Sequence, residues 1–254
     1  MYADVLANIN KRFGDYSLVV NVGASIVDNK YDELSYRGPI RAIPNVFNVF
    51  DLDNTQKKAR QDEWEEQTQS IFASAELGWK SMLYLTLTGR NDWASQLANS
   101  SSTCFFYPSV GLSAIISEMV KLPSAIDYLK IRGSFSSVGM PYPRNLTSPT
   151  FEYDETTQTW KPKTHYPIGD LKPERTNSWE LGLDMRLFKD FNLGVSWYLA
   201  NTFNQTFDPK ISVSSGYTTI YLQTGYVRNQ GVELSLGYGH TWKKDFRWQT
   251  NFTL

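Results

Sequence analysis

The 254-residue sequence has little of what marks several common classes of protein. It contains a single cysteine, Cys104, which excludes an internal disulfide and a cysteine-rich metal site. Its two histidines, His165 and His240, are far apart in the chain and do not by themselves indicate a metal site. The formal net charge is −1 and there is no basic run, which argues against nucleic acid or an anionic membrane surface as the main partner.

Long apolar runs are also missing. No stretch approaches the roughly 18 apolar residues of a transmembrane helix, and the first residues, MYADVLANINKRF, lack the apolar segment of a signal peptide. A membrane protein built from strands stays possible, because a transmembrane strand exposes only alternate residues to lipid. There is no nucleophile elbow, HExxH motif or phosphate-binding glycine loop. The sequence therefore predicts no enzyme, no cofactor and no metal site.

Alternation of apolar and polar residues is what the chain has in abundance, whereas helical spacing is hard to find. A period of two recurs along almost the whole length and predicts an all-β fold. About ten strands are expected, at residues 2–13, 16–27, 67–78, 82–91, 105–117, 127–138, 175–187, 191–203, 228–242 and 246–254.

The connections between these strands alternate between short and long. Short ones lie at 14–15, 78–82, 118–126, 188–190 and 243–245, and long ones at 28–66, 92–104, 139–174 and 204–227. In an up-and-down antiparallel sheet every second connection lies at the same edge. One edge here therefore has short turns and the other has long loops, as in outer-membrane barrels. The run DNTQKKARQDEWEE in the first long connection is interpreted as solvated loop, with a short helix as the alternative.

Two hairpins predict their own register, because a slip of one residue would set leucines opposite charges. In the hairpin at 175–203 and in the last hairpin, this register sets apolar or aromatic residues opposite one another on one face, apart from one histidine. The expected pairs are Leu187–Phe191, Met185–Leu193, Leu183–Val195, Leu181–Trp197 and Trp179–Leu199, then Trp242–Phe246, His240–Trp248, Leu236–Phe252 and Leu234–Leu254.

The apolar faces are predicted to contact lipid rather than a protein core. The strands are about 10–13 residues long, which matches the 9–11 residues of a tilted transmembrane strand better than the average soluble strand of five or six. Their polar faces are mostly Gly, Ser, Asn and Thr, which suits the wet inside of a barrel. Aromatic residues flank three of the short turns and indicate a girdle at the membrane–water interface. They are Phe13, Tyr16, Phe188, Phe191, Trp242 and Phe246.

Several stretches, dispersed over nearly the whole chain, resemble one family. They are LTLTGRNDWASQL (85–97), FFYPSVGLSAIISE (105–118), IDYLKIRGSFSSVG (126–139), GDLKPERTNSWELGLDMRLFKDFNLGVSWYLANTFNQTF (169–207) and GYVRNQGVELSLGY (225–238). In this order they look like the barrel of SusC/RagA-type TonB-dependent outer-membrane transporters.

The resemblance implies active import of large nutrients, glycans before peptides, across the Gram-negative outer membrane. It implies a 22-stranded barrel with a plug domain, a SusD-like surface lipoprotein and energy delivered by the TonB complex. About ten strands and no plug are recognised in residues 1–254, so we expect an interior fragment of the barrel, with the plug and the TonB contact in other parts of the parent chain.

Candidate binding residues fall into two groups. For substrate contact the predicted loops offer aromatic rings that could stack on sugars, although rings in long loops also pack those loops together: Trp64, Tyr142, Tyr153, Trp160 and Tyr166. Five polar residues are predicted to point into the lumen, where they would contact plug or substrate or would form charge pairs that organise the wall: Asn21, Glu180, Asp184, Arg186 and Glu233.

Two other classes of function compete with an importer. The first is a passive porin or a barrel adhesin, which would lack the plug and the TonB contact. The second is a soluble glycan-binding β-sandwich, in which Leu183 and Val195 would be buried between two sheets instead of facing lipid.

Overall fold

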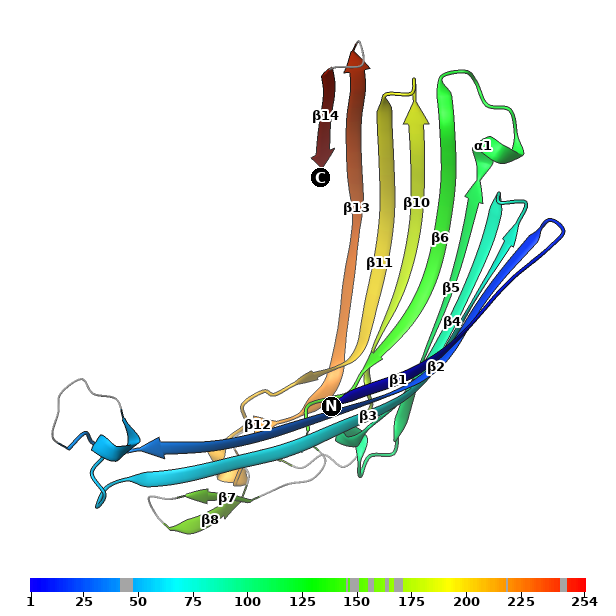
Figure 1. Ribbon diagram of the computed structural model, residues 1–254. Helices are drawn as coiled ribbons and strands as arrows, with labels where there is room; N and C mark the ends of the chain where they lie inside the picture. The colour runs from blue at the N-terminus through cyan, green and yellow to red at the C-terminus, as the bar shows by residue number, and fades with distance from the viewer. Residues whose placement is uncertain are drawn as a thin grey trace.

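The computed structural model describes residues 1–41, 48–144, 146, 151–154, 158–162, 165–166, 171–217, 219–242 and 246–254. Within these residues ten strands form one antiparallel sheet whose order follows the sequence (Figure 1). The sheet is a single curved layer, and β1 and β14 are its two edges. Its strands are β1 (Tyr2–Phe13), β2 (Tyr16–Arg37), β3 (Lys58–Trp79), β4 (Leu83–Ala94), β5 (Cys104–Ile115), β6 (Ile126–Met140), β10 (Glu174–Leu187), β11 (Phe191–Phe207), β13 (Leu222–Trp242) and β14 (Phe246–Thr253).

Short elements lie between these strands. At the long-connection edge β7 (Phe151–Asp154) pairs with β8 (Thr159–Pro162), and β9 (His165–Tyr166) pairs with β12 (Thr219–Ile220). Three 3₁₀ turns, η1 (Val49–Asp51), η2 (Ser95–Leu97) and η3 (Val213–Ser215), lie in the long connections. A four-residue helix, α1 (Ile116–Met119), begins where the strand predicted at 105–117 was expected to continue. Among the residues described, no helix is long and apolar enough to cross a membrane.

The predicted strand count, strand order and hairpin registers are confirmed. The pairs expected in the hairpin of β10 and β11 all occur, from Leu187–Phe191 to Trp179–Leu199. The last hairpin pairs Trp242 with Phe246 as expected. The predicted turn at 243–245 lies outside the described residues.

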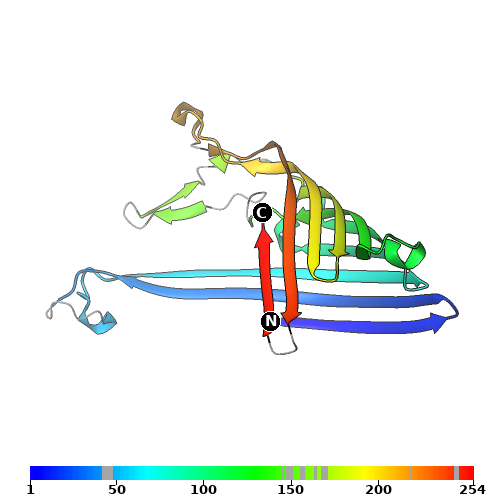
Figure 2. The same cartoon turned by 90° about the horizontal axis from the view of Figure 1, so that it is seen from above.

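The prediction that residues 28–66 form a loop is wrong for 28–37 and 58–66, which is about half of that range. Strands β2 and β3 each run for 22 residues and pair without interruption from Tyr16–Trp79 to Arg37–Lys58. At about 3.3 Å per residue such a strand is roughly 70 Å long, more than twice the hydrocarbon thickness of a bilayer. Figure 2 shows this hairpin extending far past the other strands. Beyond the membrane both faces of a strand are wet, so the backbone pairing continues although the alternation of apolar residues stops.

One face of the sheet is apolar and open to its surroundings. Leu181 is 58% exposed, Leu112 is 51% exposed and Leu236 is 45% exposed, and all lie on the convex face by register. Among the residues that the structure describes, no second layer covers the sheet, so the β-sandwich alternative does not fit. An apolar face of this extent is what a lipid-facing barrel wall presents.

Aromatic rings gather at both ends of this apolar face. At the short-turn edge Phe13 stacks on Tyr16 with ring centroids 5.7 Å apart, and Trp242 lies 5.7 Å from Phe246. At the other edge Phe203 lies 5.2 Å from Tyr226. Along β11 the 13 residues from Phe191 to Phe203 span roughly 40 Å, or about 30 Å across the membrane at a tilt of about 40°. The rings therefore bracket a band of hydrocarbon thickness.

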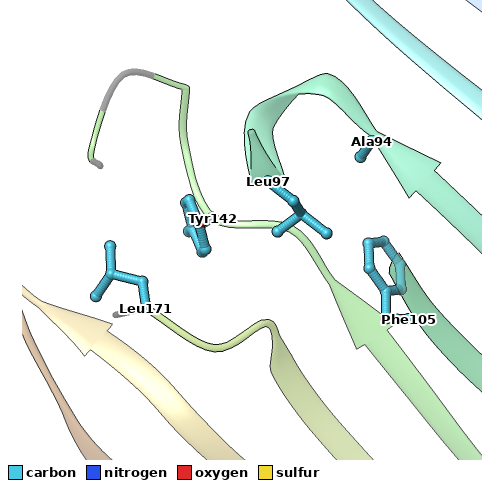
Figure 3. Close-up of a cluster of buried hydrophobic side chains, with 5 residues drawn as sticks. All are labelled: Ala94, Leu97, Phe105, Tyr142 and Leu171. Carbon is cyan, nitrogen blue, oxygen red and sulfur yellow. The ribbon is translucent and has the colours of Figure 1, made fainter. Parts of the chain in front are cut away.

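The buried hydrophobic residues that the structure describes form one small cluster at the long-connection edge (Figure 3). Leu97 of η2 and Leu171 are almost fully buried, and Phe105 of β5 packs with them. Tyr142 and Ala94 complete the group. The cluster joins the β4–β5 connection to both ends of the β6–β10 connection where they leave the sheet, so it fixes these loops relative to the barrel wall.

Candidate functional site

The concave face is lined by small polar residues that form hydrogen-bonded ladders across the strands. Asn21 of β2 accepts a hydrogen bond from the Asn8 amide at 2.5 Å and donates one to Ser74 Oγ at 3.1 Å. These three residues lie opposite one another on β1, β2 and β3. Asn21, one of the residues predicted to point into the lumen, thus lies on the concave face by register and links three strands of the wall.

A charged network lies in the middle of the concave face, and its central residue is one that sequence reasoning did not select. Arg132 of β6 donates to Glu180 Oε1 at 2.5 Å and to Ser196 Oγ at 2.8 Å, and its Nε lies 3.7 Å from Asp184 Oδ2. Two of the three carboxylates predicted to face the lumen, Glu180 and Asp184, therefore share one guanidinium. The arrangement organises the wall across β6, β10 and β11, which is one of the two roles considered for these residues.

Glycine at position 182 is required by the path of the Arg132 side chain. A Cβ at Gly182 would lie 2.5 Å from Arg132 Nε and 2.8 Å from its Cζ. The guanidinium therefore crosses β10 directly over the backbone to reach Ser196 on the far strand. An Arg on β6 with a Gly opposite it on β10 indicates this contact, but the pair can be recognised only after the register of the two strands is known.

The two other predicted lumen residues lie on the same face but outside this network. Arg186 donates to Asn192 Oδ1 at 3.2 Å near the short-turn edge. Glu233 of β13 lies opposite Ser196 of β11, so it neighbours the network across one strand. A recess of about 140 Å³ opens beside Arg132 and Glu180, lined also by Gly111, Ser113 and Ser134 among others. The concave wall can thus accept a polar group at this depth.

A second polar network lies nearer the long connections. Arg90 of β4 binds Asp92 Oδ1 at 2.7 Å and Ser70 Oγ at 2.8 Å, and the Tyr107 hydroxyl donates to Asp92 Oδ2 at 2.6 Å. The Arg90 guanidinium also lies 5.8 Å from the Phe72 ring centroid. Sequence reasoning missed this group, although Arg90 and Asp92 stand two residues apart, the spacing that places both on one face of a strand.

Two of the five aromatic candidates have their rings engaged inside the protein. Trp64 of β3 stacks on Tyr31 at 5.4 Å, and the Arg144 guanidinium lies 4.0 Å from its ring centroid. Arg144 also pairs with Glu66 at 3.6 Å, so it ties the β6–β10 connection to the long hairpin. Tyr142 is 4% exposed in the buried cluster. Both rings pack loops together.

The other three aromatic candidates are exposed at the loop edge. Tyr153 and Trp160 face each other across β7 and β8 with ring centroids 5.2 Å apart, and Trp160 is 68% exposed. Tyr166 of β9 packs edge-on against Tyr217 at 5.3 Å and is half exposed. An exposed ring held by a neighbouring ring offers a rigid flat surface to a ligand.

A charge pair links the two strands of the long hairpin outside the membrane, and hydrogen bonds within β2 and within the connecting loop accompany it. Lys30 Nζ lies 3.1 Å from Glu65 Oε1, and this contact raises the pKa of Lys30 above its ordinary value. On the other face the Tyr31 hydroxyl donates to Glu33, which raises the pKa of Tyr31. In the connecting loop, hydrogen bonds from Thr55 lower the pKa of Asp53.

The short turns carry one histidine contact. His240 Nδ1 lies 2.8 Å from Asp190 Oδ2, and the imidazole packs edge-on against Trp242 with ring centroids 4.5 Å apart. In the part of the chain that the structure describes, no cluster of His, Cys, Asp and Glu suited to a metal ion occurs. The backbone of His165 lies in β9, far along the chain from His240.

Comparison with known proteins agrees with this architecture. Residues 2–254 match the family model described as "TonB dependent receptor-like, beta-barrel". TonB-dependent receptor P39 of Formosa agariphila is 25% identical over 255 residues, which cover 96% of this chain and 24% of that protein. The chain therefore spans about a quarter of the length of this relative.

Solved structures share the fold at low sequence identity. The RagAB peptide transporter superposes with a TM-score of 0.78 at 18% identity, over 99% of this chain and 30% of that chain. The siderophore receptor PirA from Acinetobacter baumannii superposes with a TM-score of 0.59 at 18% identity, over 99% of this chain and 36% of that chain.

Proposed function

The chain belongs to the TonB-dependent receptor-like β-barrel family, and from this premise we propose that it forms part of the barrel of an active importer of large nutrients. The family places the chain in the outer membrane of a Gram-negative bacterium. The observation that carries the proposal is the division of one sheet into an apolar convex face and a polar concave face crossed by charge networks. A wall of that kind separates lipid from an aqueous interior.

Residues 1–254 are proposed to supply about ten of the barrel strands, with a plug domain contributed by another part of the parent chain. The plug would pack against the concave face, where Arg132, Glu180 and the recess beside them are exposed. The TonB complex would deliver energy through the parent chain. A SusD-like surface lipoprotein is proposed to cover the long-loop edge, by the resemblance to SusC/RagA-type transporters.

Glycans are the substrate class that we favour. Tyr153 and Trp160 present a rigid pair of exposed rings at the loop edge, and Tyr166 presents a third. Flat rings suit the apolar faces of sugars. Peptides are the second candidate, because the RagAB peptide transporter shares this fold. The exposed rings would then contact apolar side chains.

Uptake by the full-length transporter in its host tests the proposal. A strain without the gene is complemented with wild type, with Tyr153→Ala/Trp160→Ala, or with Trp160→Phe, and is grown on single polysaccharides or on peptides. Loss of about 1.4 kcal/mol of contact energy corresponds to a tenfold weaker apparent affinity. We expect Tyr153→Ala/Trp160→Ala to take up glycans with about tenfold weaker apparent affinity and to take up peptides as wild type does. We expect near wild-type uptake for Trp160→Phe.

The matched control is Trp248→Ala, which removes an exposed ring from the lipid-facing surface and leaves the loops unchanged. Collapse of the proton-motive force separates an importer from a porin, since only TonB-dependent uptake should stop. Continued uptake without that force would contradict active import. A growth defect of the double alanine variant on peptides only would indicate that peptides, not glycans, are the cargo.

A further inference from the structure

The convex face carries a groove in the band that faces lipid. It has a volume of about 570 Å³ and crosses β5, β6, β10 and β11, strands that lie side by side in Figure 1. This volume is within the range of sites that hold a small ligand. The outward side chains along it are apolar: Val110, Leu112, Phe135, Trp179, Leu181, Trp197 and Leu199.

The groove exists because position 133 has no side chain. Gly133 stands between Leu112 of β5 and Leu181 of β10 in one row across the sheet. A Cβ there would meet only the Leu181 Cδ2 atom at 3.2 Å and a backbone oxygen at 3.9 Å. A larger residue at 133 would therefore fill the hollow at modest steric cost, because the nearest atom is the end of a flexible side chain.

A polar cluster lies at the end of the groove nearest the long connections. Asn201 is two residues beyond Leu199 on the same face of β11, and Arg228 of β13 lies directly opposite it. Arg228 Nε donates to Asn201 Oδ1 at 3.0 Å and Nη2 to the Tyr226 hydroxyl at 2.9 Å. These bonds hold the guanidinium in place and use two of its five N–H donors.

A second arginine stands on the other side of β11. Arg175 lies four residues beyond Trp179 on β10, on the same face by register, and opposite Phe203. Its guanidinium makes two long contacts, each of 3.4 Å, to Ser137 Oγ and to the Phe106 carbonyl oxygen. From strand spacing and register, the Cα atoms of Arg175 and Arg228 are roughly 12 Å apart.

We propose that this groove and the two arginines form a binding site for one molecule of lipid A. The groove would hold an acyl chain, and Arg175 and Arg228 would bind the headgroup phosphates. Arginine binds phosphate in a bidentate manner. Because the long loops of such barrels are extracellular, the arginines lie at the outer leaflet, which is built from lipid A. The Arg175 guanidinium reaches over β6 to Phe106 of β5, and the Arg228 guanidinium is held at Asn201 of β11, so the two lie on either side of the end of the groove. A headgroup with two phosphates separated by a disaccharide suits two arginines placed in this way.

The site is independent of the cargo and of the TonB contact, since it needs only the outer-membrane location. The test is native mass spectrometry of the full-length transporter in detergent, after exchange into excess lipid A, dephosphorylated lipid A or phosphatidylglycerol. We expect wild type to retain lipid A at least about tenfold better than either other lipid, as loss of a charged hydrogen-bond pair predicts. Arg175→Gln/Arg228→Gln should lose this preference, and Gly133→Leu should reduce retention of all three lipids.

Two matched controls separate the site from general effects on the barrel. Arg12→Gln/Arg247→Gln removes the same charge from the concave face at the short-turn edge. Gly111→Leu adds the same side chain next to Leu112 but on the concave face. Both should retain lipid A as wild type does. Equal retention of lipid A by the wild type and the Arg175/Arg228 variant, or equal retention of phosphatidylglycerol and lipid A by wild type, would overturn the proposal.

Discussion

Replacement of Gly182 by alanine should weaken the barrel through a residue on another strand. The new Cβ would lie 2.5 Å from Arg132 Nε, so the guanidinium must move off β10. Arg132 would then lose its ion pair with Glu180 and its hydrogen bond to Ser196. The contact with Asp184, already long at 3.7 Å, would be lost as well.

The magnitude follows from the exposure of these groups. The side chains of Arg132 and Glu180 are 41% and 40% exposed, so their pair belongs with surface ion pairs worth about 0.2–1 kcal/mol. The hydrogen bond to Ser196 adds about 0.5–1.5 kcal/mol. Alanine is favoured over glycine in a strand by about 0.5 kcal/mol. The net cost of Gly182→Ala should therefore be roughly 1 kcal/mol.

Denaturant unfolding of the full-length barrel in lipid vesicles measures this cost in two backgrounds. In wild type, Gly182→Ala should lower the free energy of unfolding by roughly 1 kcal/mol. In an Arg132→Ala background nothing is displaced, and the same change should be neutral or stabilising by about 0.5 kcal/mol. An equal cost in both backgrounds would refute the idea that Gly182 is needed for the path of Arg132.

Three further predictions concern the membrane band and the long hairpin. Leu87→Arg on the convex face should lower the free energy of unfolding by about 2–4 kcal/mol in the same assay. Thr88→Arg, its neighbour on the concave face, should lower it by less than about 1 kcal/mol. Similar losses in the two variants would contradict the lipid assignment. Because Glu65 raises the pKa of Lys30, their pair stabilises the hairpin at neutral pH and is lost as the pH rises through the raised pKa. NMR titration should find a lower Lys30 midpoint in Glu65→Gln, and an unchanged midpoint would show that the pair does not form. Trp64→Ala removes a ring stack and a cation–π contact, so hydrogen exchange of the hairpin strands should quicken by about tenfold; unchanged exchange would mean that Trp64 does not pack the loops.

The membrane-spanning part of the fold was predictable because its information is local. Side chains of a strand alternate between faces, so the runs around Leu183 and Val195 define both the faces and the register of the hairpin between them. The lengths of the turns then predict which edge carries the loops. The single-layer sheet and the order of its ten strands follow from these two local features, and both are confirmed.

The hairpin beyond the membrane was not predictable by the same rule. Residues 28–37 and 58–66 have water on both faces, so no alternation marks them as strand. Their pairing is held by cross-strand contacts such as Lys30–Glu65 and Tyr31–Trp64, which become recognisable only once the two strands are aligned. The same holds for Tyr142, whose burial depends on the β4–β5 and β6–β10 connections meeting at one point.

The sequence by itself therefore determined which side chains face lipid and which face the lumen, because the alternation of apolar and polar side chains along a strand can be seen in neighbouring residues. Only the tertiary structure decided which of those side chains meet. Arg132 reaches Glu180 on the next strand and Ser196 on the strand after that. Such contacts join residues about 40–65 positions apart, and their geometry depends on the stagger and twist of several strands, which no short stretch of sequence specifies.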